Sequence, residues 1–144
     1  MILPCDPADP PTRVSALCCV ADTDPFTLVI APGTNNSAAG ALFLDEYDGY
    51  QVEVSLTMRF EFNEGVLRSR ILKRGGAGVP PAATSQIERI RFLGQSGPPR
   101  GVLVRRATGE VVEGVAMLYE PSTSTLIVRK PNVGVGEEWT VELL

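Results

Sequence analysis

The feature that most constrains the fold is the run VEVSLTMRFEF at residues 52–62, in which apolar and polar side chains alternate without a break. Apolar residues, among them Val52, Phe60 and Phe62, occupy the even-numbered positions, and polar residues occupy the odd-numbered ones. Successive side chains of a strand point to opposite faces, so this alternation places one face in a core and the other in water. An α-helix repeats every 3.6 residues and could not separate the two kinds of side chain. The run therefore predicts a half-buried β-strand.

Eight further runs have strand character, and residues that favour turns separate them, as in NEG at 63–65 and ATGE at 107–110. No segment has a convincing helical period. The expected strands are 26–31, 41–45, 52–62, 66–73, 86–94, 102–106, 111–120, 125–130 and 137–144. Strands at this spacing, each with one buried face, predict an all-β fold, an antiparallel β-sandwich of about nine strands.

The proline content divides the chain into two parts. Residues 1–25 contain five of the twelve prolines, and SALCCVA at 15–21 is the one stretch there that could keep a strand or helix period. We therefore expect residues 1–24 to form an irregular arm, either the end of a preceding domain or a linker. Residues 25–144 are expected to form a C-terminal β-sandwich domain.

Composition excludes several classes of function. The chain of 144 residues has a net charge of −4, which argues against a nucleic-acid surface, and no apolar run approaches the length of a membrane span. The absence of histidine removes Ser-His-Asp and Cys-His catalysis and most zinc sites. The cysteines Cys5, Cys18 and Cys19 do not have CxxC spacing and are interpreted as incidental thiols. We predict no catalytic residue, no metal site and no cofactor.

Glycine is abundant in the segment GGAGVPPAATS at residues 75–85. A phosphate-binding loop would need a GK[ST] sequence and a following helix, and the segment has neither. We therefore interpret it as a connecting loop.

The acidic cluster Asp45, Glu46 and Asp48 is the only candidate for carboxylate chemistry. Neighbouring residues on a strand point to opposite faces, which makes Asp45 and Glu46 poor partners for glycoside hydrolysis. A loop could bring Asp45 and Asp48 together around a hard cation or against another domain. The favoured interpretation is a solvated turn.

The aromatic residues Tyr47, Tyr50 and Trp139 could form a platform for sugar rings. Trp139 shares its strand parity with Val141 and Leu143, and this pattern places it in the core instead. Asn35 begins the sequon Asn-Asn-Ser, so it is a possible glycosylation site if the chain enters the secretory pathway.

Arginines recur at alternating positions of the expected strands, with Glu53, Glu61 and Glu88 as plausible cross-strand partners. A solvated charged face is the simplest interpretation, and a polar seam against another domain is the alternative. The arginines are Arg68, Arg70, Arg89, Arg91, Arg105 and Arg106.

Five motifs occur in the same order as in a known family: PFTLVIA, AGALFLDEYDGY, RFEFNEGVLRSR, IERIRFLG and LIVRKPNVGVGEEWTVEL. Together they resemble the C-terminal part of glycoside hydrolase family 31, the α-glucosidases, and in particular its endoplasmic-reticulum glucosidase II group. Glu46 stands where the family's loop has a second aspartate. The arm at residues 5–24 matches nothing securely.

The resemblance implies that the catalytic aspartates lie on a (β/α)8 barrel, in motifs that this sequence lacks, so no active-site residue carries over to it. It implies an accessory sandwich that packs on and supports that barrel, in an enzyme that removes terminal α-linked glucose in the endoplasmic reticulum lumen. The implied partners are the barrel and a regulatory or retention β subunit, although no localisation signal is seen in this sequence.

The alternative is a free-standing carbohydrate-binding sandwich. An isolated piece is also expected to self-associate through an exposed apolar patch, and the strand at 52–62 could pair edge-to-edge if it lies at a sheet boundary.

Overall fold

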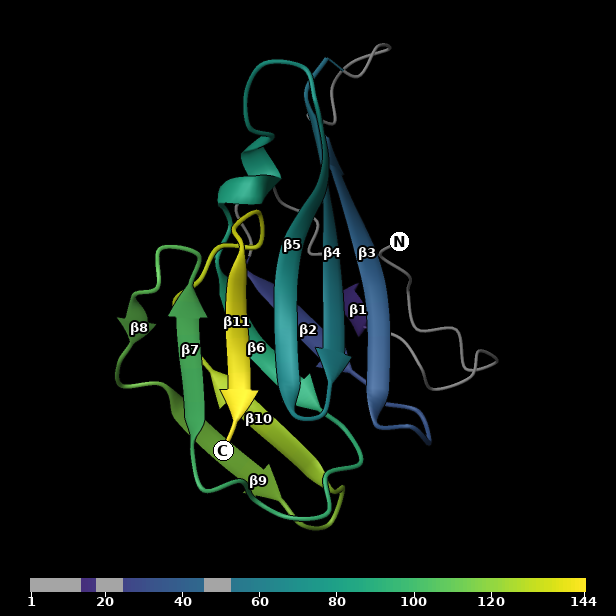
Figure 1. Ribbon diagram of the computed structural model, residues 1–144, viewed down its shortest axis with the longest axis vertical. Coiled ribbons are helices and arrows are strands. Elements are labelled where there is room, and N and C mark those ends of the chain that lie inside the picture. The colour runs from purple at the N-terminus through teal and green to yellow at the C-terminus, as the bar shows by residue number, and fades with distance from the viewer. Residues whose placement is uncertain (1–13, 18–24, 46–52) are drawn as a thin grey trace.

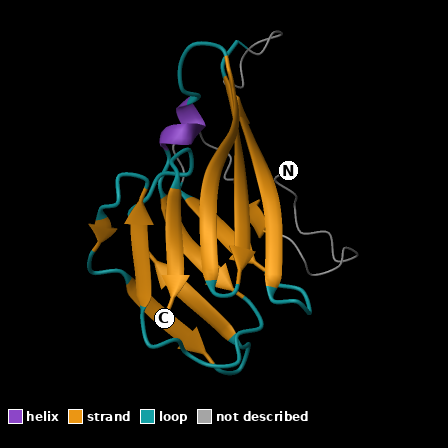
Figure 2. Cartoon of the chain, viewed as in Figure 1, coloured by secondary structure: helices purple, strands orange, loops and turns teal. Residues whose placement is uncertain are grey.

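A computed structural model describes residues 14–17, 25–45 and 53–144, and in this part of the chain eleven strands form two sheets that face each other. Strands dominate, and one short 3-10 helix, η1 (Pro81–Thr84), lies at one end (Figures 1 and 2). The five-stranded sheet has the order β1 (Val14–Leu17), β2 (Phe26–Ile30), β6 (Ile87–Phe92), β10 (Thr125–Arg129), β9 (Ala116–Glu120). The six-stranded sheet has the order β3 (Ser37–Asp45), β4 (Ser55–Asn63), β5 (Val66–Gly75), β11 (Trp139–Leu143), β7 (Val102–Arg106), β8 (Val111–Val112).

Residues 55–62 of the alternating run lie in β4, so the prediction of a half-buried strand is confirmed for them, whereas residue 52 lies outside the described residues. Leu56, Met58, Phe60 and Phe62 are all buried, whereas the residues between them are partly or fully exposed. Glu64 and Gly65 both have positive φ angles, 48° and 81°, as a two-residue hairpin turn requires. This turn pairs β4 with β5 in antiparallel register.

The core lies between the two sheets and is closed by aromatic contacts. The rings of Phe60 and Trp139 lie 5.9 Å apart within the six-stranded sheet. Phe62 of that sheet meets Phe92 of the other sheet at 5.4 Å, so the pair joins the two layers. Both sheets thus bury one face in one common apolar cluster.

One pair of strands departs from the antiparallel prediction, because β2 and β6 run parallel. The three antiparallel strands β3, β4 and β5 separate them in the sequence and belong to the opposite sheet. An odd number of antiparallel strands returns the chain to the end at which β2 began, so β6 must run in the same direction as β2.

The expected single strand at 111–120 is also wrong, since the segment divides into β8 and β9, which belong to different sheets. Gly114 has a φ of 72° between them, a conformation that glycine adopts easily. The strand count rises further because β1 lies inside the segment expected to be an irregular arm. The division into domains stays a prediction.

Edge pairing of the strand at 52–62 would need a position at a sheet boundary, and β4 does not have one. β4 lies between β3 and β5, so both of its edges are occupied, and self-association through this strand is ruled out as a mechanism. In the part of the chain that the structure describes, no helix has the length and apolar character needed to cross a membrane.

Candidate functional site

The outer face of the six-stranded sheet carries a group of charged side chains that we call the β4–β5 charged face, namely Arg59 and Glu61 of β4 with Arg68 and Arg70 of β5. The alternation that buries Phe60 and Phe62 turns Arg59 and Glu61 outward. Across the hairpin Arg59 lies opposite Arg70, and Glu61 lies opposite Arg68. Residues that are opposite in a sheet share a face, so all four point to the same side.

One ion pair is found within the β4–β5 charged face. The Nε of Arg59 donates a hydrogen bond to Oε1 of Glu61 at 2.9 Å. Among the described residues, neither Arg68 nor Arg70 makes a hydrogen bond or ion pair through its guanidinium. Glu61 is a cross-strand neighbour of Arg68, as predicted, but its ion pair is with Arg59, two residues away on the same strand.

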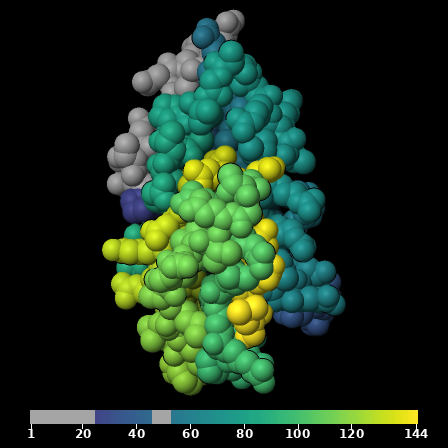
Figure 3. Space-filling view, turned by 60° about the vertical axis from the view of Figure 1, so that its left-hand side comes forward, coloured from purple at the N-terminus to yellow at the C-terminus, as the bar shows by residue number. Residues whose placement is uncertain are grey.

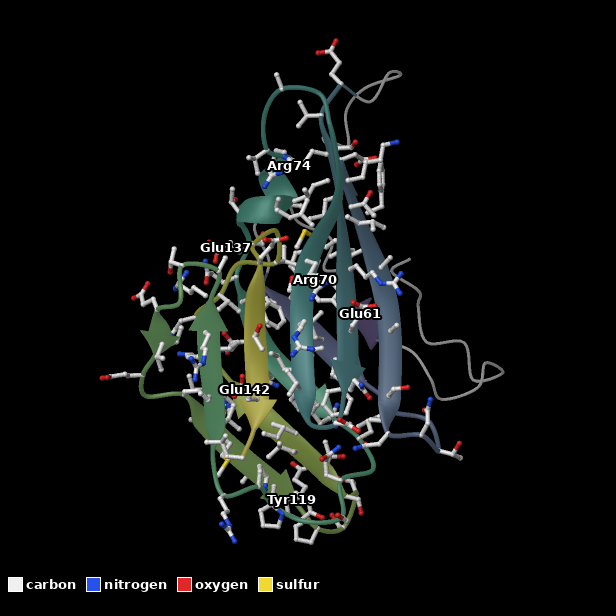
Figure 4. The ribbon with its side chains drawn as sticks, viewed as in Figure 1. Glu61, Arg70, Arg74, Tyr119, Glu137 and Glu142 are labelled. Carbon is white, nitrogen blue, oxygen red and sulfur yellow. The ribbon has the colours of Figure 1, made fainter. Side chains whose placement is uncertain are left out.

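Two hollows lie beside Arg68 and Arg70, and both arginines line each hollow. The larger, of about 560 Å³, is also lined by Asn35, Glu61 and Asn63. The smaller, of about 310 Å³, extends toward Glu138 and Thr140 at the start of β11. Arg70 and Glu61 are labelled on their strands in Figure 4. The arrangement offers hydrogen-bond donors and positive charge on an open surface.

A second polar group is structural, and we call it the β10–β11 loop clamp. Nη2 of Arg106 donates to the carbonyl oxygen of Asn132 at 2.5 Å, and Nη1 donates to Oε2 of Glu137 at 3.2 Å. Oε2 of Glu137 also accepts from the backbone N–H of Gly134 at 3.1 Å, and Nε1 of Trp139 donates to the carbonyl oxygen of Gly134 at 3.0 Å. Side chains from β7 and β11 thus hold the loop from both sides.

The same loop closes one end of the sandwich. Val133 and Val135 are fully buried, and the backbone N–H groups of Val135 and Gly136 donate to the carbonyl oxygens of Ser85 and Ala83 near η1. The sequence patterns left this segment unassigned between two expected strands and did not predict its role. The alternating valines and glycines of PNVGVG were a signal that it is packed.

The predicted roles of the aromatic and arginine residues can now be compared with the structure. Trp139 is 2% exposed, so the core prediction is confirmed and the residue cannot form part of an exposed sugar platform. Arg106 belongs to the β10–β11 loop clamp and is not simply solvated. Its carboxylate partners are Glu137 and Glu110, and neither was predicted. Arg89 and Arg91 lie exposed on β6, in the other sheet.

The remaining candidates are placed only in part. Asp45 ends β3 opposite Ser55, whereas Glu46, Asp48, Tyr47 and Tyr50 lie outside the described residues, as do the three cysteines. No cluster of three histidine, cysteine, aspartate or glutamate side chains suited to a metal occurs in residues 14–17, 25–45 and 53–144. Asn35 is exposed in the turn before β3, and its glycosylation stays a prediction.

In the space-filling view the C-terminal segment, in yellow, appears between the green residues that follow position 100 and the teal residues of the β4–β6 region (Figure 3). This agrees with the position of β11 between β5 and β7 in the sheet. The last strand is therefore an internal part of the sandwich.

Comparison with known proteins identifies relatives for most of the chain. No family model matches the sequence. A probable glucan 1,3-α-glucosidase of Arabidopsis thaliana is 34% identical over 135 residues, which cover 85% of this chain and 14% of that protein. Neutral α-glucosidase AB of Sus scrofa is 32% identical over 128 residues, which cover 87% of this chain and 13% of that protein. The chain spans about a seventh of the length of these curated relatives.

Solved structures share the fold. A glucosidase II α subunit bound to α3-Glc2 superposes with a TM-score of 0.72 at 23% identity, over 92% of this chain and 16% of that one. The catalytic subunit in a heterodimeric complex of endoplasmic-reticulum glucosidase II, which includes the binding domain of the regulatory subunit, gives a TM-score of 0.67 at 24% identity, over 85% of this chain and 15% of that one. The chain is thus related, over most of its length, to one portion of the α-glucosidases of glycoside hydrolase family 31.

Proposed function

We propose that this chain is the accessory C-terminal β-sandwich of a family 31 α-glucosidase, and that it packs on and supports the catalytic barrel of that enzyme. The observation that carries the proposal is the ratio of the two coverages. The similarity takes in 85% of this chain but only 14% of the α-glucosidase from Arabidopsis thaliana. A segment that corresponds to a seventh of an enzyme, and that is built wholly as a sandwich in its described part, supports the role of one layer of a larger protein.

Surface features of the sandwich support this role. Phe43 on the outer face of β3 and Leu118 on β9 are each about half exposed, and apolar side chains of this size favour burial against a partner surface. An interface between domains inside an enzyme commonly includes apolar contacts of this kind.

The activity of the parent enzyme belongs to the same proposal. It would hydrolyse terminal α-linked glucose from glycans or oligosaccharides in the lumen of the endoplasmic reticulum, and a regulatory subunit would hold it there. The related glucosidase II structure contains such a subunit's binding domain. The catalytic residues would lie on the barrel, so the sandwich alone should have no hydrolase activity.

The test uses the native protein. An antibody raised against residues 53–144 is used to deplete an extract of the source cells, and hydrolysis of p-nitrophenyl α-glucoside is measured before and after depletion. The proposal expects most of one α-glucosidase activity to leave the extract together with a polypeptide about seven times the length of this chain, in line with the coverage of the relatives. Pre-immune serum is the control. Full activity left in the depleted extract, with only a 144-residue polypeptide captured, would reject the proposal.

A free-standing carbohydrate-binding module is the second candidate, favoured by the 560 Å³ hollow with amide and carboxylate side chains at its rim. Titration of the chain with maltose and nigerose, followed by calorimetry, separates the two. Binding of either sugar by a naturally short polypeptide supports the module.

A further inference from the structure

The β4–β5 charged face contains three arginines, Arg59, Arg68 and Arg70, and one carboxylate, that of Glu61. Arg59 and Arg70 lie directly opposite each other, and like charges in this position destabilise a sheet. Glu61 is engaged by Arg59, and Oε1 of Glu138 accepts a hydrogen bond from the backbone N–H of Ile71 at 3.0 Å. Within the β4–β5 charged face, an anion from outside the chain would offset the positive charge that Glu61 leaves.

The shape of the surface provides room for such an anion. On β3 the outward residues opposite Arg59 and Glu61 are Ala41 and Ala39. Their side chains are short beside the long side chains of β4 and β5, so the face is hollowed next to Arg68 and Arg70. The hollow of about 560 Å³ is within the range of small-molecule sites.

The donors around the hollow define the chemistry of a ligand. Arg68 and Arg70 are two residues apart on one strand, so their guanidiniums leave the same face about 7 Å apart at the backbone. Each guanidinium can bind a phosphate or carboxylate through two parallel hydrogen bonds. Asn35 and Asn63 add amide groups that suit hydroxyls, while Glu61 disfavours a second anionic group at its end of the hollow.

We propose that the hollow beside Arg68 and Arg70 binds a monosaccharide-sized ligand that carries one anionic group and several hydroxyls, such as a sugar phosphate or a sugar acid. The two arginines hold the anionic group, and the two asparagines contact the hydroxyls. The inference rests on the hollow and its lining side chains alone, and it does not use the proposed role in an α-glucosidase.

The experiment titrates the full 144-residue chain with glucose 6-phosphate, glucuronate, glucose and inorganic phosphate, with calorimetry as the readout. We expect the first two to bind more tightly than either glucose or inorganic phosphate. The double variant Arg68→Gln/Arg70→Gln should weaken that binding by about tenfold or more, since it removes both charge-assisted contacts. Circular dichroism checks that the variant is folded, which is expected because both residues are exposed.

The matched control is Arg89→Gln/Arg91→Gln, which removes two exposed arginines with the same spacing from β6 of the other sheet. It should leave the affinity within about twofold of the original, since local contacts and not total charge set the binding. The single variant Arg70→Lys keeps the charge but loses the planar fork, and it should give an intermediate affinity.

Several results would overturn the proposal. Equal weakening by the control and test variants would mean non-specific attraction. If glucose bound as tightly as glucose 6-phosphate, the site would not require an anionic group. If inorganic phosphate bound as tightly as glucose 6-phosphate, the site would not recognise the sugar. Absence of binding by both anionic sugars at millimolar concentration would reject the site. None of these results would affect the depletion test of α-glucosidase activity.

Discussion

Gly136 shows how a single residue fixes the end of this sandwich. A β-carbon placed on it would lie 2.7 Å from both the β-carbon and the carbonyl oxygen of Ala83 in η1. The backbone N–H of Gly136 donates to that same carbonyl at 3.1 Å. The loop and the helix can approach this closely only because the residue has no side chain.

Substitution Gly136→Ala should therefore lower the free energy of unfolding by about 1–3 kcal/mol, the usual cost of forcing an extra methyl group into a packed site. Urea titration followed by the fluorescence of the single tryptophan, Trp139, measures the change. Gly97→Ala is the control, because an added β-carbon there meets no atom within 4 Å. Equal stability of both variants would contradict the account of this contact.

At the scale of elements, β9 is an edge strand of the five-stranded sheet with exposed apolar side chains. It ends the sheet and pairs with β10 alone. Met117 and Leu118 are 41% and 50% exposed, and no charge or proline occurs in the strand before Glu120. Edge strands of this kind invite pairing with another chain, so we expect β9 to contribute to self-association.

The variant Leu118→Lys should reduce self-association of the chain, because a charge on an edge strand opposes pairing. Light scattering over a range of protein concentrations gives the average mass. Leu72→Lys is the matched control, since it also places a lysine at an exposed apolar position but on β5, which is internal to its sheet. A mass that falls equally in both variants would show that general charge repulsion, and not the edge, controls association.

At the scale of the whole molecule, the two sheets depend on one apolar cluster. The contact between Phe62 and Phe92 joins the layers, and η1 and the β10–β11 loop close one end. Neither sheet could keep its buried face out of water without the other. The described part of the chain should therefore unfold as one cooperative unit.

The expected result is that two probes give the same urea midpoint. Fluorescence of Trp139 follows the six-stranded sheet and its core contact, whereas far-UV circular dichroism follows strands in both sheets. The Gly97→Ala variant should also give the same urea midpoint with both probes, because the added β-carbon meets no atom within 4 Å. Separate midpoints would mean that one sheet survives the loss of the other.

The sequence by itself determined which residues are buried in β4 and β11. The alternation at 52–62 and the parity of Trp139 with Val141 fixed the core faces of β4 and β11, and the family motifs fixed the relation to α-glucosidases. These inferences succeeded because the side-chain direction in a strand depends only on the residue's position along it. For the candidate site, the same alternation correctly put Arg68 and Arg70 on the exposed side.

Only the tertiary structure decided which elements became neighbours. The parallel pairing of β2 with β6 and the ion pair between Arg106 and Glu137 each join residues that lie far apart in the chain. The segment 111–120 divides between two sheets, which its local pattern did not indicate. The hollow beside Arg68 and Arg70 also required the short side chains of β3 to lie next to β4. Local pattern carries no information on such pairing, because the free energy that selects it comes from packing the whole core at once.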